Sequence, residues 1–272
     1  MDTIQSGQRF GFGDNWLDFA RSLSAEQIEE AECSVRKFLR CETLAGQTLL
    51  DVGSGSGLFS LAARRLGARV YSFDYDTSSV RCTQQLREQH FPNDPNWRVE
   101  RGSILDHDYV RGLGKFDVVY AWGVLHHTGA MHGAIANAAS AVAPNGLFAF
   151  ALYHRTRLGG LWRAEKRWYA TASVEAQRRA RAIFVALYQL RFMLTGGNFA
   201  SFVANYKTLR GMNFSSDVHD WMGGYPYEEI SSPEVDALML RHGFACVHRD
   251  QTPVTIGLFG SGCDEYLYRR LN

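Results

Sequence analysis

The first 153 residues alternate between apolar runs and connections long enough to form helices. The apolar runs that favour strands lie at 48–52, 69–73, 97–101, 116–121 and 147–153. The connections that can each hold a helix are 56–66, 77–90 and 130–142. Strands that alternate with helices pair in parallel through right-handed crossovers, so this pattern predicts a doubly wound α/β sheet.

The two ends of the chain extend the pattern. Ser24 and Gln27 have the spacing of a capping box, which predicts an amphipathic helix over 25–40. The apolar positions of this helix are Ile28, Ala31, Val35 and Phe38. Near the C-terminus, Ser232-Pro233-Glu234 is typical of an N-cap with proline at the first helical position, and Gly243 is expected to end that helix. The segments FACVHRD and EYLYRR predict the last two strands.

The alternation of strands and helices ends after Tyr153, and residues 154–213 contain no convincing strand pattern. Helical spacing predicts a long amphipathic helix whose apolar positions include Ile183, Leu187, Leu190 and Leu194. We therefore predict one domain over 1–272, built on a Rossmann-like, doubly wound, mostly parallel seven-stranded sheet. An N-terminal helical lid is expected at about 1–45 and a helical insertion, after the fifth strand, at about 154–230.

Charge and cysteine content narrow the class of protein. The formal net charge of +1 gives no bulk electrostatic case for nucleic acid or an anionic membrane. Five scattered cysteines form no CxxC pair and no zinc-like spacing, which predicts reduced thiols, a cytoplasmic protein and no metal centre. The chain shows no signal-peptide pattern and no apolar stretch long enough to span a bilayer. The first part of the insertion is rich in arginine and lysine, which suits a solvated helix face or, alternatively, a cationic wall facing an anionic substrate.

A glycine turn, GSGSGL (53–58), follows the first predicted strand. A dinucleotide fingerprint would require glycine where Leu58 stands, and a phosphate loop would require GK[ST]. The glycines form a tight turn on which a ligand can lie against bare backbone. Asp74 ends the second strand, where a carboxylate can accept both ribose hydroxyls, and Asp51 is suited to a cationic ligand group. A carboxylate that can bind ribose, without a loop that binds phosphate, suits S-adenosylmethionine.

These features resemble the first two motifs of class I S-adenosylmethionine-dependent methyltransferases. Further matches follow in order: "GSILD" (102–106), "FDVVYAWGVLHHT" (116–128) and "VAPNGLFAFALY" (142–153). The last resembles the family's L-x-P-G-G turn, with Asn145 in place of the first glycine. The match covers roughly 45–153 and is closest in character to small-molecule methylases such as those of ubiquinone biosynthesis.

The resemblance implies a cofactor site along the carboxyl ends of the first four strands. Its glycines would line the methionine part of the cofactor, Asp74 would hold the ribose, and Tyr75 would pack on the adenine. Many relatives have aspartate where this chain has Ser103, so a carboxylate contact to the adenine amine is not expected here. Trp122 would bring backbone near the cofactor's amino group or, alternatively, pack in the core. The full set is Asp51, Gly53, Ser54, Gly55, Gly57, Leu58, Asp74, Tyr75, Ser103, Ile104, Ala121 and Trp122.

Methyl transfer needs alignment and, for a protonated nucleophile, a base. His126 and His127 follow the fourth strand and Tyr153 ends the fifth, at the edge where open α/β sheets bind ligands. An imidazole suits removal of a hydroxyl proton near neutral pH. Relatives often keep a histidine at the place of His127, so His126 is the freer candidate base, although either histidine can be structural.

Two aromatic segments are candidates for covering the acceptor. "VHDWMGGYPYE" (218–228) reads as a loop that forms a substrate lid or, alternatively, a loop packed by its own aromatics. "FGFGDNW" (10–16) can fold over the bound cofactor. The substrate-binding candidates are Phe12, Trp16, His154, His219, Trp221, Tyr225, Tyr227 and Glu228.

The sequence thus predicts a methyltransferase that acts on a small organic molecule, at oxygen, with arginines that can admit a carboxylate or phosphate. DNA-adenine and protein-glutamine methylases carry [DN]-P-P-[YF] after strand four, where this chain has AWGV. The alternatives are an RNA or protein methyltransferase, or a non-catalytic partner subunit that binds the cofactor. Leu58 argues against a nicotinamide dehydrogenase. The sequence leaves the oligomeric state open.

Overall fold

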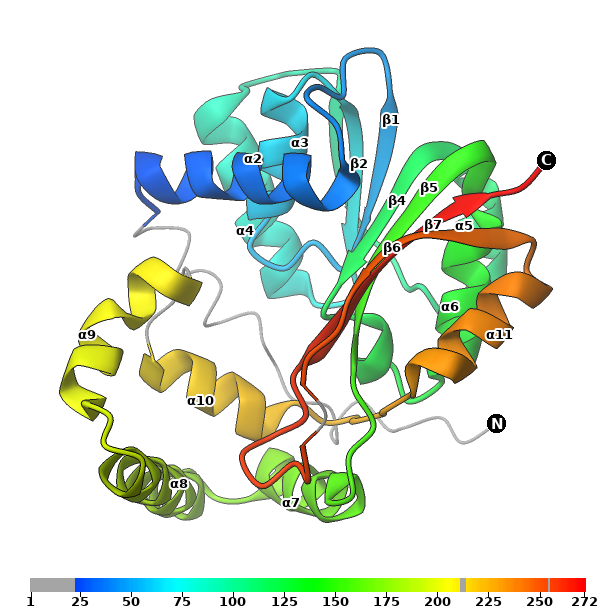
Figure 1. Ribbon diagram of the computed structural model, residues 1–272. Coiled ribbons are helices and arrows are strands. Elements are labelled where there is room, and N and C mark those ends of the chain that lie inside the picture. Colours follow the sequence, from blue (N-terminus) through cyan, green and yellow to red (C-terminus); the bar gives the residue numbers. More distant parts are fainter. Residues whose placement is uncertain (1–22, 211–213, 254) are drawn as a thin grey trace. The chain divides into compact units, whose positions relative to one another are not determined.

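The computed structural model describes residues 23–210, 214–253 and 255–272 (Figure 1). The described chain divides into two compact units. Among the described residues, we call 23–156, 228–253 and 261–272 the sheet unit, and 157–227 with 255–260 the helical unit.

The sheet unit contains seven strands in the order β3-β2-β1-β4-β5-β7-β6. The first five pair in parallel, whereas β7 runs antiparallel to both β5 and β6. The strands are β1 (Thr48–Val52), β2 (Arg69–Asp74), β3 (Trp97–Arg101), β4 (Phe116–Trp122), β5 (Val142–Tyr153), β6 (Phe244–Asp250) and β7 (Cys263–Arg270). This confirms the predicted seven-stranded, mostly parallel, Rossmann-like sheet.

Helices cover both faces of the sheet (Figure 1). Apolar side chains of α2 (Ala25–Leu39), α3 (Leu58–Arg65) and α4 (Thr77–His90) form one buried layer with the sheet. The opposite layer contains side chains of α5 (His107–Gly112), α6 (Met131–Ser140) and α11 (Ser232–Arg241). Strand β5 supplies both layers, because Phe148 and Phe150 lie in one and Ala149 lies in the other. Each large apolar side chain buried in this way contributes roughly 1.5–3 kcal/mol.

Helix ends in the sheet unit follow local sequence signals. The predicted capping box of α2 is present, with Ser24 Oγ accepting from the Gln27 amide and Gln27 Oε1 accepting from the Ser24 amide. The predicted cap of α11 is wrong by one residue. Ser231, whose backbone is extended, caps that helix and forms a capping box with Glu234, which leaves Ser232 as the buried first helical residue. Gly243 follows the helix with a φ of 79°, as expected.

The helical unit contains α7 (Gly159–Thr171), α8 (Val174–Leu194), α9 (Phe199–Arg210) and α10 (Phe214–Gly223). Helix α8 confirms the predicted long helix, but the four apolar residues that indicated it are exposed. The aromatic side chains of Phe184 and Tyr188 make its contacts inside the unit, with Trp221 and Phe259. Among the described residues, no helix is both long and apolar enough to cross a bilayer.

Candidate active site

The glycine turn follows β1 at the carboxyl edge of the sheet. Gly53, Gly55 and Gly57 have φ angles of 71°, 53° and 81°, which glycine adopts at little cost. A Cβ on Gly53 would lie 2.6 Å from both methyl carbons of Val124, so this position also excludes any side chain sterically. The Gly53 and Ser54 amides donate to the Phe73 carbonyl and tie the turn to β2. The turn therefore presents bare backbone at a fixed position.

Asp74 is partly buried at the end of β2, beside this turn. Its Oδ2 accepts from the Gly55 amide at 3.0 Å, and its Oδ1 accepts from the Asp76 amide at 2.8 Å. Burial raises the pKa of Asp74 to about 6, although these hydrogen bonds lower it in part. A carboxylate oxygen can accept more than one hydrogen bond, so this geometry is compatible with two further donors, such as a ribose diol.

Asp51 lies inside the sheet unit and is buried. Ser60 Oγ donates to Asp51 Oδ2 at 2.5 Å and also lies 2.6 Å from Ser72 Oγ. The indole of Trp97 donates to the same Ser72 hydroxyl at 3.0 Å. Burial raises the pKa of Asp51 to about 7. The carboxyl thus braces the start of α3 against β1 and β2, and its contact with a cationic ligand group stays a prediction.

Three large apolar side chains at the ends of β2, β3 and β4 are between 38 % and 46 % exposed: Tyr75, Leu105 and Trp122. Trp122 donates from Nε1 to Glu265 Oε1 at 3.3 Å, so the alternative of plain core packing is wrong for this residue. Exposed apolar groups along a ligand-binding edge indicate a surface that a flat ring can cover. Leu105 was not among the predicted site residues, although it directly follows Ile104 in the GSILD motif.

The remaining predicted cofactor residues support this edge. Ser103 Oγ accepts from the Leu105 amide at 3.2 Å and shapes the turn after β3. Ile104 is buried, and its carbonyl accepts from Asn137 Nδ2 at 2.8 Å. Ser54 Oγ lies 3.0 Å from Thr83 Oγ1. Ala121 is buried in β4, and Leu58 is partly buried as the first residue of α3.

An aromatic cluster lies where β4 and β5 end. His126 and His127 belong to the short 3-10 helix η2 (Leu125–His127). The ring centroid of His126 lies 4.0 Å from that of Tyr153 and 4.4 Å from that of His127, while His127 and Tyr153 are 5.3 Å apart. His126 is completely buried and His127 is partly exposed. His126 is thus the less exposed of the two histidines, and its role as the base stays a prediction.

Glu228 supports this cluster from outside it. The Glu228 amide donates to the His126 carbonyl at 3.1 Å. Both carboxylate oxygens accept from the Met131 amide, at 3.1 and 3.3 Å, at the first residue of α6. The residue that precedes α6, Ala130, makes no side-chain cap. Glu228 thus supplies the cap that the α6 sequence lacks, and it holds η2 in place.

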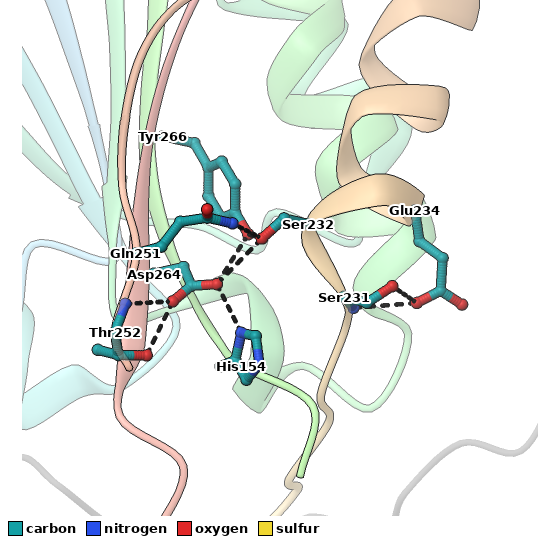
Figure 2. Close-up of polar contacts among 8 residues, drawn as sticks. All are labelled: His154, Ser231, Ser232, Glu234, Gln251, Thr252, Asp264 and Tyr266. Atoms are coloured by element: carbon teal, nitrogen blue, oxygen red, sulfur yellow. Dashed lines mark hydrogen bonds and ion pairs between the residues drawn. The ribbon is translucent and has the colours of Figure 1, made fainter. Parts of the chain in front are cut away.

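His154 follows Tyr153 directly and contacts a carboxylate that the sequence analysis missed (Figure 2). Its Nδ1 lies 2.8 Å from Oδ2 of Asp264, which is completely buried in β7. Asp264 also accepts from the Thr252 amide and hydroxyl at 2.9 Å and from Ser232 Oγ and the Tyr266 hydroxyl at 3.2 Å. Burial raises the pKa of Asp264, but the hydrogen bonds from His154 and Thr252 outweigh it and leave this pKa below its ordinary value.

This arrangement fixes the tautomer of the neutral His154 ring. An ionised carboxylate only accepts hydrogen bonds, so Nδ1 carries a proton, and in the neutral imidazole Nε2 is the nitrogen with the lone pair. An imidazole oriented by a buried carboxylate is the arrangement in which histidine acts as a base.

The late aromatic segment was predicted as a loop, but helix α10 covers 214–223, so that prediction is wrong for 218–223. His219 Nδ1 lies 2.7 Å from the Tyr169 hydroxyl and 2.8 Å from Nη1 of Arg181. The Trp221 ring packs on Trp162 at 4.4 Å, and its carbonyl accepts from Lys166 Nζ. Burial lowers the pKa of His219, and Arg181 lowers it further.

The last residues of that segment differ in exposure. Tyr227 is buried, whereas Tyr225 is partly exposed. A substrate contact for the late segment stays a prediction. The predicted Phe12 and Trp16 lie outside the described residues.

Comparisons with known proteins give a consistent picture. A family model described as "Methyltransferase domain" matches residues 24–196. The chain is 35 % identical over 137 residues to a ubiquinone biosynthesis O-methyltransferase of Methylobacterium sp. (strain 4-46), covering 47 % of this chain and 51 % of the relative. It is 36 % identical over 86 residues to a ribosomal protein L11 methyltransferase of Helicobacter hepaticus, covering 31 % and 26 %. The chain thus spans about half, or less, of the length of these curated relatives.

Solved structures share the fold. Magnesium protoporphyrin IX methyltransferase from Synechocystis PCC 6803, crystallised with SAH, superposes with a TM-score of 0.53 at 15 % identity, over 89 % of this chain and 83 % of that one. PKMT2 from Rickettsia typhi, in complex with AdoHcy, superposes with a TM-score of 0.56 at 15 % identity, over 88 % and 52 %. At this identity, the likeness establishes the fold.

Proposed function

The chain belongs to the methyltransferase domain family, and from this premise we propose that it transfers the methyl group of S-adenosylmethionine to an oxygen of a small organic molecule. The observation that carries the cofactor assignment is the carboxyl edge of β1–β4. A bare glycine turn, a partly buried carboxylate and three exposed apolar side chains there fit a nucleoside with a flat base and no phosphate.

The proposed contacts follow from this edge. Asp74 would accept the ribose hydroxyls, Tyr75 and Leu105 would cover the adenine, and the turn at 53–57 would hold the methionine part. The bound cofactor supplies an activated methyl group, so the chain's own residues need only hold the acceptor in line and remove its proton.

Similarity to the ubiquinone biosynthesis O-methyltransferase, at 35 % identity over 137 residues, favours a small acceptor with a hydroxyl group. The AWGV segment at the end of β4 lacks the prolines of the amide- and amine-gripping classes. A protein acceptor is the second candidate, because the ribosomal protein methyltransferase relative matches at similar identity over 31 % of the chain. The small-molecule partner and the cytoplasmic location expected from the sequence stay predictions.

We assign the base to His154, with Asp264 as the residue that positions it. His154 Nε2 would take the proton of the acceptor hydroxyl, while the bound cofactor would supply the methyl group. His126 is completely buried, so it suits support of Tyr153 better than contact with an acceptor. The partly exposed His127 is the rival base.

Calorimetry with S-adenosylhomocysteine and NAD tests the cofactor assignment. We expect micromolar-range affinity for S-adenosylhomocysteine, roughly −8 kcal/mol, and a clear preference over NAD. Asp74→Asn should weaken this binding by about 1.5–3 kcal/mol, because hydrogen bonds to a charged acceptor are lost. Asp117→Asn is the matched control, since Asp117 binds Thr48 at the opposite, amino edge of the sheet and should leave affinity unchanged.

The pH dependence of binding adds an independent check. The pKa of Asp74 is about 6, so affinity should fall as the pH drops below about 6, where the carboxylate takes up a proton. An ordinary aspartate would hold its charge to about pH 4.

A preference for NAD, or normal binding by Asp74→Asn, would overturn the cofactor assignment. Transfer of a labelled methyl group to a panel of hydroxylated metabolites, and to protein, then separates the two acceptor classes.

A further inference from the structure

Helix α8 carries an apolar stripe that nothing within the described residues covers. The stripe consists of Ile183, Leu187, Leu190 and Leu194, which are between 48 % and 79 % exposed. Their spacing of four, three and four residues places them on one side of the helix. Contiguous exposed apolar side chains of this size mark an interaction surface.

The stripe is distinct from the side of α8 that packs inside the helical unit. That inner side carries aromatic residues, whose ring centroids lie 5.5 Å from Trp221 for Phe184, 5.2 Å from Phe259 for Tyr188, and 4.9 Å from Phe202 for Phe192. Helix α8 is therefore apolar on two sides, although burial inside the unit requires only one. The outer side is available to a partner.

The charge of the chain is unevenly divided. Residues 157–227 contain ten lysines and arginines against four acidic residues, a net charge of +6. The whole chain carries +1, so the remaining residues carry −5. Within α8, Arg181 contacts Tyr169 and His219, and Arg191 lies over the Tyr188 and Phe259 rings, so both are on the inner side. Arg178 and Arg179 share the single acidic residue of the helix, Glu175. The side chains of Arg178 and Arg179 are 70 % and 77 % exposed, and Arg179 lies one turn before Ile183.

These charges discriminate between the possible occupants of the stripe. A second copy laid against the first would bring together two segments that each carry a net charge of +6, and like charges repel. An anionic surface would instead pair with them. A polyanion without an apolar phase would satisfy the arginines but leave the leucines in water. A surface that offers both phosphate groups and a hydrocarbon boundary fits both features.

We propose that α8 docks the protein on the surface of an anionic lipid bilayer, with the apolar stripe lying in the headgroup–acyl boundary and the arginines on lipid phosphates. The helix lies in the plane of the surface and does not cross it, in keeping with its mixed composition. The inference stands on exposure and charge and does not depend on the methyl acceptor.

Flotation with vesicles tests the proposal on the full chain. We expect binding to phosphatidylcholine vesicles that contain phosphatidylglycerol, weaker binding to pure phosphatidylcholine, and a loss of binding as salt rises. The double variant Leu187→Gln/Leu190→Gln should lower the partition coefficient by about tenfold or more, because two apolar side chains no longer enter the boundary. Arg178→Gln/Arg179→Gln should reduce both the binding and its salt dependence.

The matched control is Leu240→Gln/Leu271→Gln, which changes two leucines of the sheet unit that are 70 % and 51 % exposed. This control should bind vesicles like the parent. Affinity for S-adenosylhomocysteine, measured in parallel, should be the same in all variants, which separates loss of docking from misfolding or from failure of the proposed activity.

Four outcomes would overturn the proposal. The first is no binding to phosphatidylglycerol vesicles. The second is binding that the Leu187/Leu190 variant retains in full. The third is a lipid-free dimer that this variant abolishes, which would make the stripe an interface between copies. Tight binding to tRNA that depends on the arginines, without vesicle binding, would likewise replace the lipid surface with RNA.

Discussion

At the scale of single residues, the His154–Asp264 pair carries the main chemical consequence of the structure. Five hydrogen bonds hold the buried carboxylate, so its position is fixed before any acceptor arrives. The carboxylate in turn fixes the Nδ1 proton of His154, so Nε2 is the ring nitrogen available to take a proton in the proposed reaction. Such a pair is effective because no reorganisation is needed when the imidazole becomes charged.

Replacement of these residues gives a graded prediction. With the acceptor found in the labelled-methyl screen, His154→Ala should lower turnover by about 100- to 10,000-fold, the usual cost of a lost general base, with S-adenosylhomocysteine affinity unchanged. Asp264→Asn should lower turnover less and shift the acidic limb of the pH–rate profile, since the positioning contact changes while the base remains. Steady-state rates against pH measure both. A full loss in His127→Ala together with near-normal rates in His154→Ala would move the base to His127.

The residues that sequence reasoning found and missed differ in their separation along the chain. The glycine turn and Asp74 lie within about 20 residues of each other in a strand–turn–helix–strand unit, so their spacing alone indicates a nucleotide-like ligand. His154 and Asp264 are 110 residues apart and meet only because β7 pairs antiparallel with β5. No local pattern encodes that contact. The burial of His126 also involves a residue from another element, because its ring packs against Tyr153 as well as against the neighbouring His127.

At the scale of elements, the junction of η2 and α6 depends on a residue from a distant segment. Helix α6 begins without a side-chain cap of its own, and the Glu228 carboxylate lies on the Met131 amide. A carboxylate at a helix N-terminus accepts from the free amides and also interacts favourably with the helix dipole. The backbone of the same residue binds the His126 carbonyl.

Glu228→Ala should therefore lower the free energy of unfolding by about 1–2 kcal/mol. Glu228→Gln should cost less, about 0.3–1 kcal/mol, because the amide oxygen still accepts and only the charge is lost. Urea denaturation measures both, and Glu88→Ala, on an exposed face of α4, is the control expected within about 0.5 kcal/mol of the parent. If Glu228→Gln keeps its stability and loses turnover, the carboxylate takes part in the chemistry instead.

The sequence predicted helices and strands correctly where the spacing of apolar residues was compatible with a single buried side. The strands and helices of the sheet unit follow from alternating apolar runs and capping residues such as Ser24. Helix α8 shows the limit, because its period predicts a helix but two of its sides are apolar. The sequence does not indicate which side faces outward, since only the neighbouring aromatic residues decide that. Helix α10 was not predicted, because the glycines and tyrosines that follow it suggested a loop.

At the scale of the whole molecule, net charge and stability are sums that conceal opposing parts. A formal charge of +1 gives no bulk electrostatic case for an anionic surface, yet the chain divides into +6 over 157–227 and −5 elsewhere. The pH dependence of stability is likewise a sum of pKa shifts with opposite effects. Burial raises the pKa of Asp51 to about 7 and that of Glu165 to about 7, whereas burial lowers the pKa of His219. As the pH falls below 7, the raised carboxyls stabilise the folded chain, while a histidine with a lowered pKa destabilises it.

The variant Asp51→Asn isolates the contribution of Asp51 to the pH dependence of stability. The folded pKa of Asp51 is about 7 and an unfolded aspartate titrates near 4, so between these values the folded chain holds a proton that the unfolded chain has released. Linkage then requires that Asp51 stabilise the fold more as the pH falls from 8 to 5, and lose that contribution as the pH rises through 7. The parent should gain about 1–3 kcal/mol over Asp51→Asn across this range. Urea unfolding of both proteins at pH 8 and pH 5 measures the difference, in which the contributions of histidines and other carboxyls cancel. A difference that does not change with pH would mean that Asp51 keeps an ordinary pKa and that water reaches the Ser60–Ser72 network.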